Sequence, residues 1–473
     1  MTQAPDIVTT SAPDAYVSWR EFLTGGHTAA LILVSLAVML HAADSLIVAT
    51  MLPSIVADIK GASLVGLAVS LYEMGSIVAG AASAILTMRI GLRHPMALAA
   101  GMFGLGCLVS AASPTMALFL VGRTMQGLGG GGMVAMCFIA ISVLFPRRYA
   151  ARALAVVSTI WGISSFLGPL FGGAFVAYAT WRWGFVCFGA VAFGLGVWIF
   201  MRPQSEPAPQ QSAGAVFPFR RLMLLCIAIL LIAASGVSIA PLRSGVTILC
   251  GIAALGLFLW LDARAGDSRM LPRRPFDLRT RIGAALVMIV TLSMATIAIA
   301  AFGPLLITAI HEAPALTVGY VVSCGSIGWT LAAILVSGFS VRTDRLMIAL
   351  GMGLVAASVP GMLYAVPYGP LWLIAFVALI EGIGFGMAWT FVLRRTETLA
   401  SASEVQRIAG AIPTVQRLGY ALGAVYVGLV ANAAGILTMT TGSSAIEVAQ
   451  WVYVSCLPLA ALGMIATLAF VRR

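Results

Sequence analysis

Residues 126–133 read QGLGGGGM and residues 381–387 read EGIGFGM, each inside a long apolar run. The two stretches share one glycine spacing, and each lies in the fourth apolar segment of its half of the chain. Small residues on one helix face let a neighbouring helix approach closely in a membrane. Close packing alone would explain either stretch, but their repetition favours a parallel repeat of two six-span bundles, which is a transporter architecture.

The composition around these stretches excludes a soluble protein. Of the 473 residues 61% are hydrophobic and only 9% are charged, whereas about a quarter of a soluble domain is charged. The same numbers exclude a disordered chain, a collagen and a secreted disulfide framework. The seven cysteines lie in or beside apolar runs and form no CxxC pair. They are expected to pack in the core and not to bind a metal.

The pattern predicts an all-α polytopic membrane protein: two six-helix bundles and an inserted two-helix hairpin. A membrane helix needs about 20 mainly apolar residues. Fourteen segments meet this condition, at 29–52, 62–86, 94–113, 116–145, 152–178, 183–201, 222–241, 244–261, 282–310, 315–340, 346–366, 370–392, 408–434 and 449–471. The first is too long for a cleaved signal peptide and is expected to remain.

Two polar stretches divide the fourteen segments into six, two and six. The seventh and eighth segments are joined only by residues 241–244, so a re-entrant hairpin is an alternative to two full spans there. The expected organisation is a cytoplasmic tail at 1–28, a six-span bundle at 29–201, a cytoplasmic linker at 202–221, a hairpin at 222–261, a basic cytoplasmic linker at 262–281 and a second six-span bundle at 282–471.

The distribution of positive charge predicts the orientation. The formal net charge is +11, but the arginines are divided among short loops, which argues against a nucleic-acid surface. With both termini in the cytoplasm, 22 of the 27 Lys and Arg residues lie on that side. Lys60, Arg182 and Arg243 lie on the opposite side, and two arginines lie inside spans. We therefore expect a multi-pass protein with both termini in the cytoplasm.

Five ionisable residues fall inside the expected spans: Asp44, Glu73, Arg123, Glu381 and Arg417. Each costs a few kcal/mol to hold in lipid, so each is a functional hypothesis. At about 1.5 Å per residue, the first three lie roughly 10–16 Å from the outer ends of their spans and are expected to cluster. Glu381 and Arg417 lie about 13–14 Å from the inner face and are candidates for a second pair.

These charges permit a static or a functional interpretation. Static ion pairs would merely neutralise one another. If Asp44 and Glu73 share Arg123, however, one carboxyl lacks full compensation and suits reversible proton uptake. Asp44→Asn or Glu73→Gln is then expected to abolish proton-driven transport while the protein still folds. His41, one turn from Asp44, is either a proton relay or a packing residue.

Enzymatic function is not expected. The sequence contains no GxxxxGK[ST] phosphate loop, no HExxH and no GxSxG, and no soluble segment is large enough for a catalytic domain. We therefore expect no cofactor, and a proton gradient in place of ATP as the energy source.

Motifs in three spans resemble those of the major facilitator superfamily, in particular its fourteen-span drug:proton antiporters. The resemblance covers the chain from about residue 29 and implies the major facilitator fold. Its most specific part fits the antiporter pattern GxxxGPxxGG, with Ser in place of the first Gly, at Ser164, Gly168, Pro169, Gly172 and Gly173. The resemblance implies that this element marks an exporter and limits proton leak.

Two further motifs resemble the family's proton-coupling elements. The run from Arg123 to Gly127 is similar to RxxQG, whose Arg is assigned to proton coupling. Asp44 begins a stretch similar to LDxTIVNVALP, but Leu46 stands where Thr is usual and Ala49 where Asn is usual. The polar lining of the cavity is therefore expected to differ from that of typical members.

The loop after the second span departs further from the family. Arg89, Gly91 and Arg93 fit its gating pattern GxLaDrxGRk, but Met88 stands where the Asp belongs. This puts in doubt the salt-bridged latch that the family uses here. Glu73 is not part of the general pattern either and is expected to be specific to this member.

The combined prediction is a proton-coupled exporter of lipophilic or cationic small molecules in a bacterial inner membrane. Asp44, Glu73 and Arg123 would couple protons, and the substrate cavity would hold Glu73, Gln126, Glu381 and Arg417. The expected partners are the substrate, protons and membrane lipid, and a monomer is favoured. A transporter of a specific metabolite, lipid or siderophore is an alternative, and a non-transporting sensor or scaffold is a remote one.

Overall fold

The computed structural model describes residues 19–202, 218–237, 241–336, 338–400, 404–439 and 442–472. Most of the expected tail at 1–28 and of the first linker at 202–221 lies outside these ranges. The first half contains α1 (Trp19–Thr24), α2 (Thr28–Ile59), η1 (Ala62–Leu64), α3 (Val65–Ile90), α4 (Arg93–Ala111), α5 (Met116–Leu144), α6 (Arg147–Tyr178) and α7 (Trp181–Met201).

The remaining elements form a central hairpin and a second half. The hairpin is α8 (Phe219–Val237) and α9 (Pro241–Ala263), followed by η2 (Gly266–Ser268). The second half contains α10 (Arg281–Ala301), α11 (Gly303–His311), α12 (Ala315–Val336), η3 (Val341–Thr343), α13 (Asp344–Tyr368), α14 (Leu371–Leu399), α15 (Val405–Ala433) and α16 (Ser443–Arg472).

The described part of the chain is helical and contains no strand, which confirms the all-α membrane fold. Twelve of its helices are long and apolar enough to cross a membrane. Each of the fourteen expected segments coincides with a helix or a pair of helices. Helices α8 and α15 lie outside the twelve, and in α15 the side chains of Gln416, Arg417 and Asn432 reduce the hydropathy. The count of fourteen spans stays a prediction.

Two expected boundaries were wrong, and proline accounts for both. The segment 282–310 is divided at Phe302 into α10 and α11, because Pro304 in the first turn of α11 has no N–H for a helix continuing from α10. The residues expected to connect the hairpin, 241–244, instead form the first turn of α9, where Pro241 suits the start of a helix.

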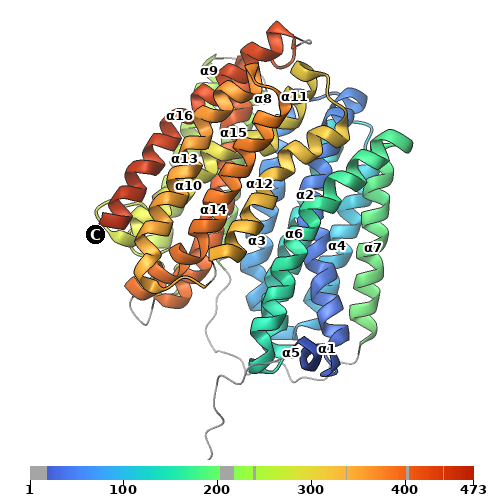
Figure 1. Cartoon of the computed structure of the whole chain (residues 1–473), viewed down its shortest axis with the longest axis vertical. Coiled ribbons are helices and arrows are strands. Elements are labelled where there is room, and N and C mark those ends of the chain that lie inside the picture. Colours follow the sequence, from blue (N-terminus) through green and yellow to red (C-terminus); the bar gives the residue numbers. More distant parts are fainter. Residues whose placement is uncertain are drawn as a thin grey trace, which may run out of the picture.

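The two halves lie side by side, with the first half in blue to green and the second in yellow to red (Figure 1). In the first half α3 packs against α5, and α2 packs against α6 and α5. In the second half α12 and α13 pack against α14. Contacts between the halves run mainly from α6 to α12 and from α3 to α15.

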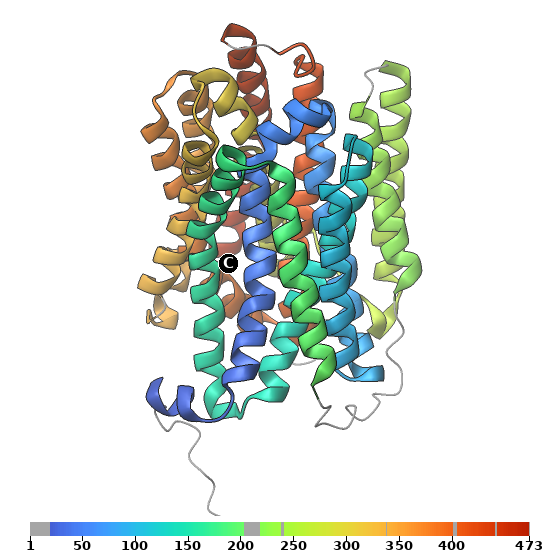
Figure 2. The same cartoon turned by 90° about the vertical axis from the view of Figure 1, so that its right-hand side faces the viewer.

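The α8–α9 hairpin stands at one edge of the bundle, on the right of Figure 2. Helix α8 packs against α15 and α3, and α9 packs against α8. The outer face of α9 exposes large apolar side chains such as Leu249 and Ile252. Such a face belongs against lipid.

The glycine repeat that opened the sequence has the same packing in both halves. A methyl group at Gly127 would overlap the backbone of Tyr72 on α3, and one at Gly382 would overlap the backbone of Gly325 on α12. Four residues further on, Gly131 meets α3 and Gly386 meets α12 in the same way. Helix α14 therefore packs on α12 as α5 packs on α3, as expected for a parallel repeat.

Candidate functional site

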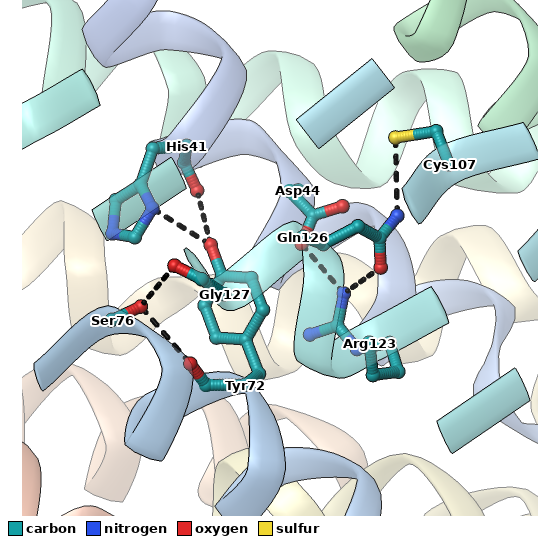
Figure 3. Close-up of polar contacts among 8 residues, drawn as sticks. All are labelled: His41, Asp44, Tyr72, Ser76, Cys107, Arg123, Gln126 and Gly127. Carbon is teal, nitrogen blue, oxygen red and sulfur yellow. Dashed lines mark hydrogen bonds and ion pairs between the residues drawn. The ribbon is translucent and has the colours of Figure 1, made fainter. Parts of the chain in front are cut away.

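A buried ion pair joins α2 to α5 at the centre of the first half. Arg123 Nη1 donates to Asp44 Oδ2 at 2.7 Å, as Figure 3 shows. Only 2% of the Asp44 side chain and 4% of the Arg123 side chain are exposed. This confirms that the two charges expected at one level lie together. Removing either partner would leave the other charge uncompensated in the interior.

Three further groups hold the Arg123 guanidinium in place. Arg123 Nη1 also donates to Gln126 Oε1 at 2.9 Å, and Gln126 Nε2 donates to Cys107 Sγ on α4 at 3.1 Å. The guanidinium lies over the ring of Tyr72, with Cζ 4.3 Å from the ring centroid. A cation over an aromatic face in a desolvated site is stabilised by about 2 kcal/mol. Gln126 therefore orients the arginine in the first half, a role that the RxxQG resemblance did not specify.

The glycine run of α5 makes room for the side chains opposite it. A methyl group at Gly130 would lie 2.6 Å from His41 Nδ1. At Gly127 it would overlap the backbone of Tyr72, the residue that stacks on Arg123. Ser76 Oγ, one turn beyond Tyr72, donates to the Gly127 carbonyl at 3.2 Å (Figure 3). The run thus sets both the helix spacing and the position of the site.

A second ion pair connects the two halves. Arg417 Nη1 on α15 donates to Glu73 Oε2 on α3 at 3.0 Å. The expectation that Asp44 and Glu73 share Arg123 is therefore wrong, because each carboxylate has its own arginine. Consecutive residues project about 100° apart on a helix, so Tyr72 faces Arg123 while Glu73 faces α15. The alternative pairing of Arg417 with Glu381 is not formed.

His41 connects the two ion pairs, although the sequence left its role open. Its Nε2 lies 3.2 Å from Arg417 Nη2, and its Nδ1 lies 2.8 Å from Tyr72 Oη. Arginine can only donate, so Nε2 accepts and Nδ1 carries the ring proton toward Tyr72. A continuous set of contacts therefore runs from Asp44 through Arg123, Tyr72 and His41 to Arg417 and Glu73. Hereafter it is called the polar chain.

Glu381 lies apart from the polar chain, in the seam between α13 and α14. Its Oε2 accepts from Ser358 Oγ at 3.2 Å, and no described cation forms an ion pair with it. The carboxylate of Glu381 interacts electrostatically with Tyr453 and Cys456 on α16 and with Tyr420 on α15. The Tyr453 hydroxyl is buried without a hydrogen-bond partner among the described residues. Of the three carboxyls expected in the membrane, Glu381 is thus the one without an arginine.

The antiporter motif lies where the two halves meet. Methyl groups at Gly168 and Gly172 of α6 would lie 2.8 Å from Leu46 Cβ and 3.0 Å from Thr50 Cβ on α2. At Gly173 a methyl group would lie 2.8 Å from Leu316 Cβ on α12. One helix therefore packs closely on both halves through this motif. Two other members lie in the same helix: Ser164, whose buried hydroxyl has no described partner, and Pro169, which packs on α12.

The gating loop has a different anchor from the one the family pattern implies. Gly91 ends α3 with φ of 78°, which glycine adopts without strain. Arg93 Nη1 donates to the Arg202 carbonyl at the end of α7 at 2.9 Å, and Met88 supplies no carboxylate. Arg89 lies in the last turn of α3. In the second half, by contrast, Arg394 forms an ion pair with Asp344 at the start of α13.

Sequence reasoning missed Tyr72, Cys107 and the Asp344–Arg394 pair. Tyr72 and Cys107 carry no motif, and their contacts depend on how α3 and α4 pack against α5. The pair of Asp344 and Arg394 could have been found from the sequence, because Asp344 lies just before one expected span and Arg394 lies just after the next. The described residues contain no group of three or more His, Cys, Asp or Glu side chains that could hold a metal ion.

The arrangement of two related helical halves around buried charges agrees with a family-level comparison. The family model described as Major Facilitator Superfamily matches residues 34–424. The chain belongs to the Major Facilitator Superfamily. Among solved members of this fold, the nucleoside transporter NupG superposes with a TM-score of 0.63 at 13% identity, covering 93% of this chain and 99% of NupG.

Other comparisons agree with this facilitator fold. The xylose transporter XylE from E. coli, in an inward-open conformation, superposes with a TM-score of 0.59 at 16% identity, covering 91% of this chain and 94% of XylE. Among curated relatives, "Probable multidrug-efflux transporter Rv1634" of Mycobacterium tuberculosis is 28% identical over 471 residues, covering 95% of this chain and 96% of the relative. The facilitator is therefore similar over nearly its whole length to a probable multidrug-efflux transporter.

Proposed function

We propose that this facilitator is a proton-coupled antiporter that exports lipophilic or cationic small molecules by alternating access of its two halves. Export is supported by the similarity to the mycobacterial efflux relative and by the antiporter motif of α6. A fourteen-span topology with both termini in the cytoplasm of a bacterial inner membrane belongs to the same proposal. It is supported by the positive-inside distribution of the arginines.

The observation that carries the proposal is the polar chain. It begins at a buried ion pair in the first half and ends at one that crosses to the second half. Protonation of either carboxylate would remove the charge that holds its arginine. At Glu73 this would release Arg417, and with it a contact between the halves. Proton binding and conformational change can thus be linked through one set of side chains.

Glu381 adds a third titratable carboxyl to this scheme. Because no described arginine pairs with it, a charged Glu381 inside the membrane is costly unless it binds a proton or a cation. Its described hydrogen-bond partner is the hydroxyl of Ser358 on α13, which suits a proton better than an organic cation. We assign Glu381 to proton binding, and Asp44 and Glu73 to the switch between conformations.

The test is transport by the purified protein in liposomes. A pH indicator inside the vesicles reports proton movement while cationic dyes, anionic metabolites or lipids are added in turn. Cationic dye movement that requires the pH gradient supports the proposal. Transport of a single anionic compound would establish a specific transporter in its place, and silence with every compound would favour a sensor or scaffold.

A further inference from the structure

The loop between α9 and α10 is fixed by a buried ion pair that the transport scheme does not use. Arg221 Nη1 at the start of α8 donates to Asp262 Oδ1 at 2.6 Å. Asp262 also accepts from the backbone N–H groups of Met270 at 3.0 Å and Leu271 at 2.9 Å. Arg221 Nη2 donates to the Ser268 carbonyl at 2.8 Å. Three points of the loop are thus tied to one buried carboxylate and its arginine.

This anchored loop surrounds a positively charged cavity. The cavity has a volume of about 470 Å³. Ala263 and Gly266 line it together with four arginines, which we call the arginine cradle: Arg264, Arg269, Arg273 and Arg274.

Among the described residues, carboxylates form ion pairs with only two of the four cradle arginines. Arg269 lies 3.8 Å from Glu404, and Arg274 lies 3.7 Å from Asp277. Arg264 lies over the ring of Trp260, with Cζ 3.8 Å from the ring centroid, and forms no ion pair with a described residue. Arg273 forms no ion pair with a described residue. Four arginines that line one cavity can form a site for an anion with several oxygens.

The position of the cradle indicates where such an anion comes from. It lies at the end of α9, the outer helix of the hairpin, whose apolar face is directed away from the bundle. Leu257 and Trp260, in the last two turns of α9, are 47% and 49% exposed. An exposed Trp at a helix end beside arginines is typical of the membrane interface. The cavity therefore opens where lipid headgroups lie.

We propose that the arginine cradle binds a phosphate group, which an anionic phospholipid supplies from its headgroup. Arginines in a cytoplasmic loop would satisfy the positive-inside rule in any arrangement. That rule does not require a buried Asp262 to fix the loop, nor four arginines around one cavity. An anion at this position would hold the outer hairpin to the membrane surface while the two halves move.

The test compares two double variants that remove the same charge. Arg273→Gln/Arg274→Gln removes two exposed members of the cradle and leaves in place the ion pair of Arg221 with Asp262 that anchors the loop. Arg342→Gln/Arg345→Gln removes two exposed arginines, Arg342 in η3 and Arg345 in the first turn of α13. The full chain in neutral detergent is titrated with phosphatidylglycerol, phosphatidylcholine or inorganic phosphate. Bound molecules are counted by native mass spectrometry.

We expect phosphatidylglycerol to bind the wild type and the Arg342→Gln/Arg345→Gln control equally. Its binding to the cradle variant should be about 30-fold weaker, because two of the four arginines that line the cavity are lost, whereas the control keeps all four. Competition by inorganic phosphate would identify free phosphate as a second source of the same group. Equal binding to the two double variants, or equal binding of phosphatidylcholine and phosphatidylglycerol to the wild type, would overturn the proposal.

Discussion

Glu381 occupies in the second half the position that Gln126 occupies in the first. Gln126 precedes the glycine of α5 that packs on α3, and Glu381 precedes the glycine of α14 that packs on α12. Each side chain contacts the preceding long helix, Gln126 at Cys107 and Glu381 at Ser358. The charges differ, however. Three residues before Gln126 stands Arg123, whereas Ala378 stands three residues before Glu381. The first half therefore holds a paired cation beside an amide, and the second holds an unpaired acid.

This correspondence makes Glu381→Gln a conservative test of proton binding. The variant gives the second half the side chain that the first half already carries at this position, so it should fold. We expect it to lose most proton-driven export, by at least about tenfold, because an amide cannot take up or release a proton. Transport in proteoliposomes measures the rate, and infrared difference spectra report the carboxyl band during a pH titration.

Ser358→Ala is the matched control for Glu381. It removes the described hydrogen bond to the carboxylate but keeps the titratable group. We expect it to retain coupled transport with a changed pH profile. If Glu381→Gln transports at the wild-type rate and its infrared titration is unchanged, Glu381 does not bind the coupled proton.

The contact between Glu73 and Arg417 should bias the equilibrium between conformations. Glu73→Gln removes a charge but leaves Arg417 in contact with His41. The pair is partly exposed, so we expect a loss of about 1 kcal/mol and a shift of about fivefold toward states in which α3 and α15 are apart. Distances between spin labels on α3 and α15, measured by pulsed electron resonance, report this shift. Glu73→Asp is the control, and an unchanged distance distribution in Glu73→Gln would contradict the role.

The helices could be predicted from sequence because each is a long apolar run, while the pairing of charges could not. The estimated depth of each residue in the membrane correctly predicted that Asp44 lies near Arg123. Depth contains no information on the direction in which a side chain leaves the helix, so it did not show that Glu73 faces α15 and not α5. His41 and Arg417 are separated by 376 positions in the chain and meet only because the halves pack together. Rotation and packing are tertiary properties that span-by-span reasoning does not contain.

The buried pair of Asp44 and Arg123 changes the expectation for folding. Asp44→Asn was expected to leave folding intact, but the structure shows that it would remove the carboxylate paired with a nearly inaccessible Arg123. We expect a loss of about 3–5 kcal/mol, seen as a lower unfolding temperature in detergent. Asp44→Asn/Arg123→Gln removes both charges and should recover much of this loss. Equal unfolding temperatures for the wild type and the single variant would show that the pair does not stabilise the fold.

The glycines of the repeat should tolerate substitution according to what they pack against. Gly382→Ala places a methyl group against the backbone of Gly325, which cannot rotate away, so α14 and α12 must separate. Overpacking of this kind costs about 1–3 kcal/mol. Gly410→Ala, on α15 in the same half, meets no atom within 4 Å and should stabilise its helix by about 0.5–1 kcal/mol. Thermal unfolding of the two variants should therefore shift in opposite directions. A shift of the same sign and size in both would mean that close approach of α14 to α12 does not limit this position.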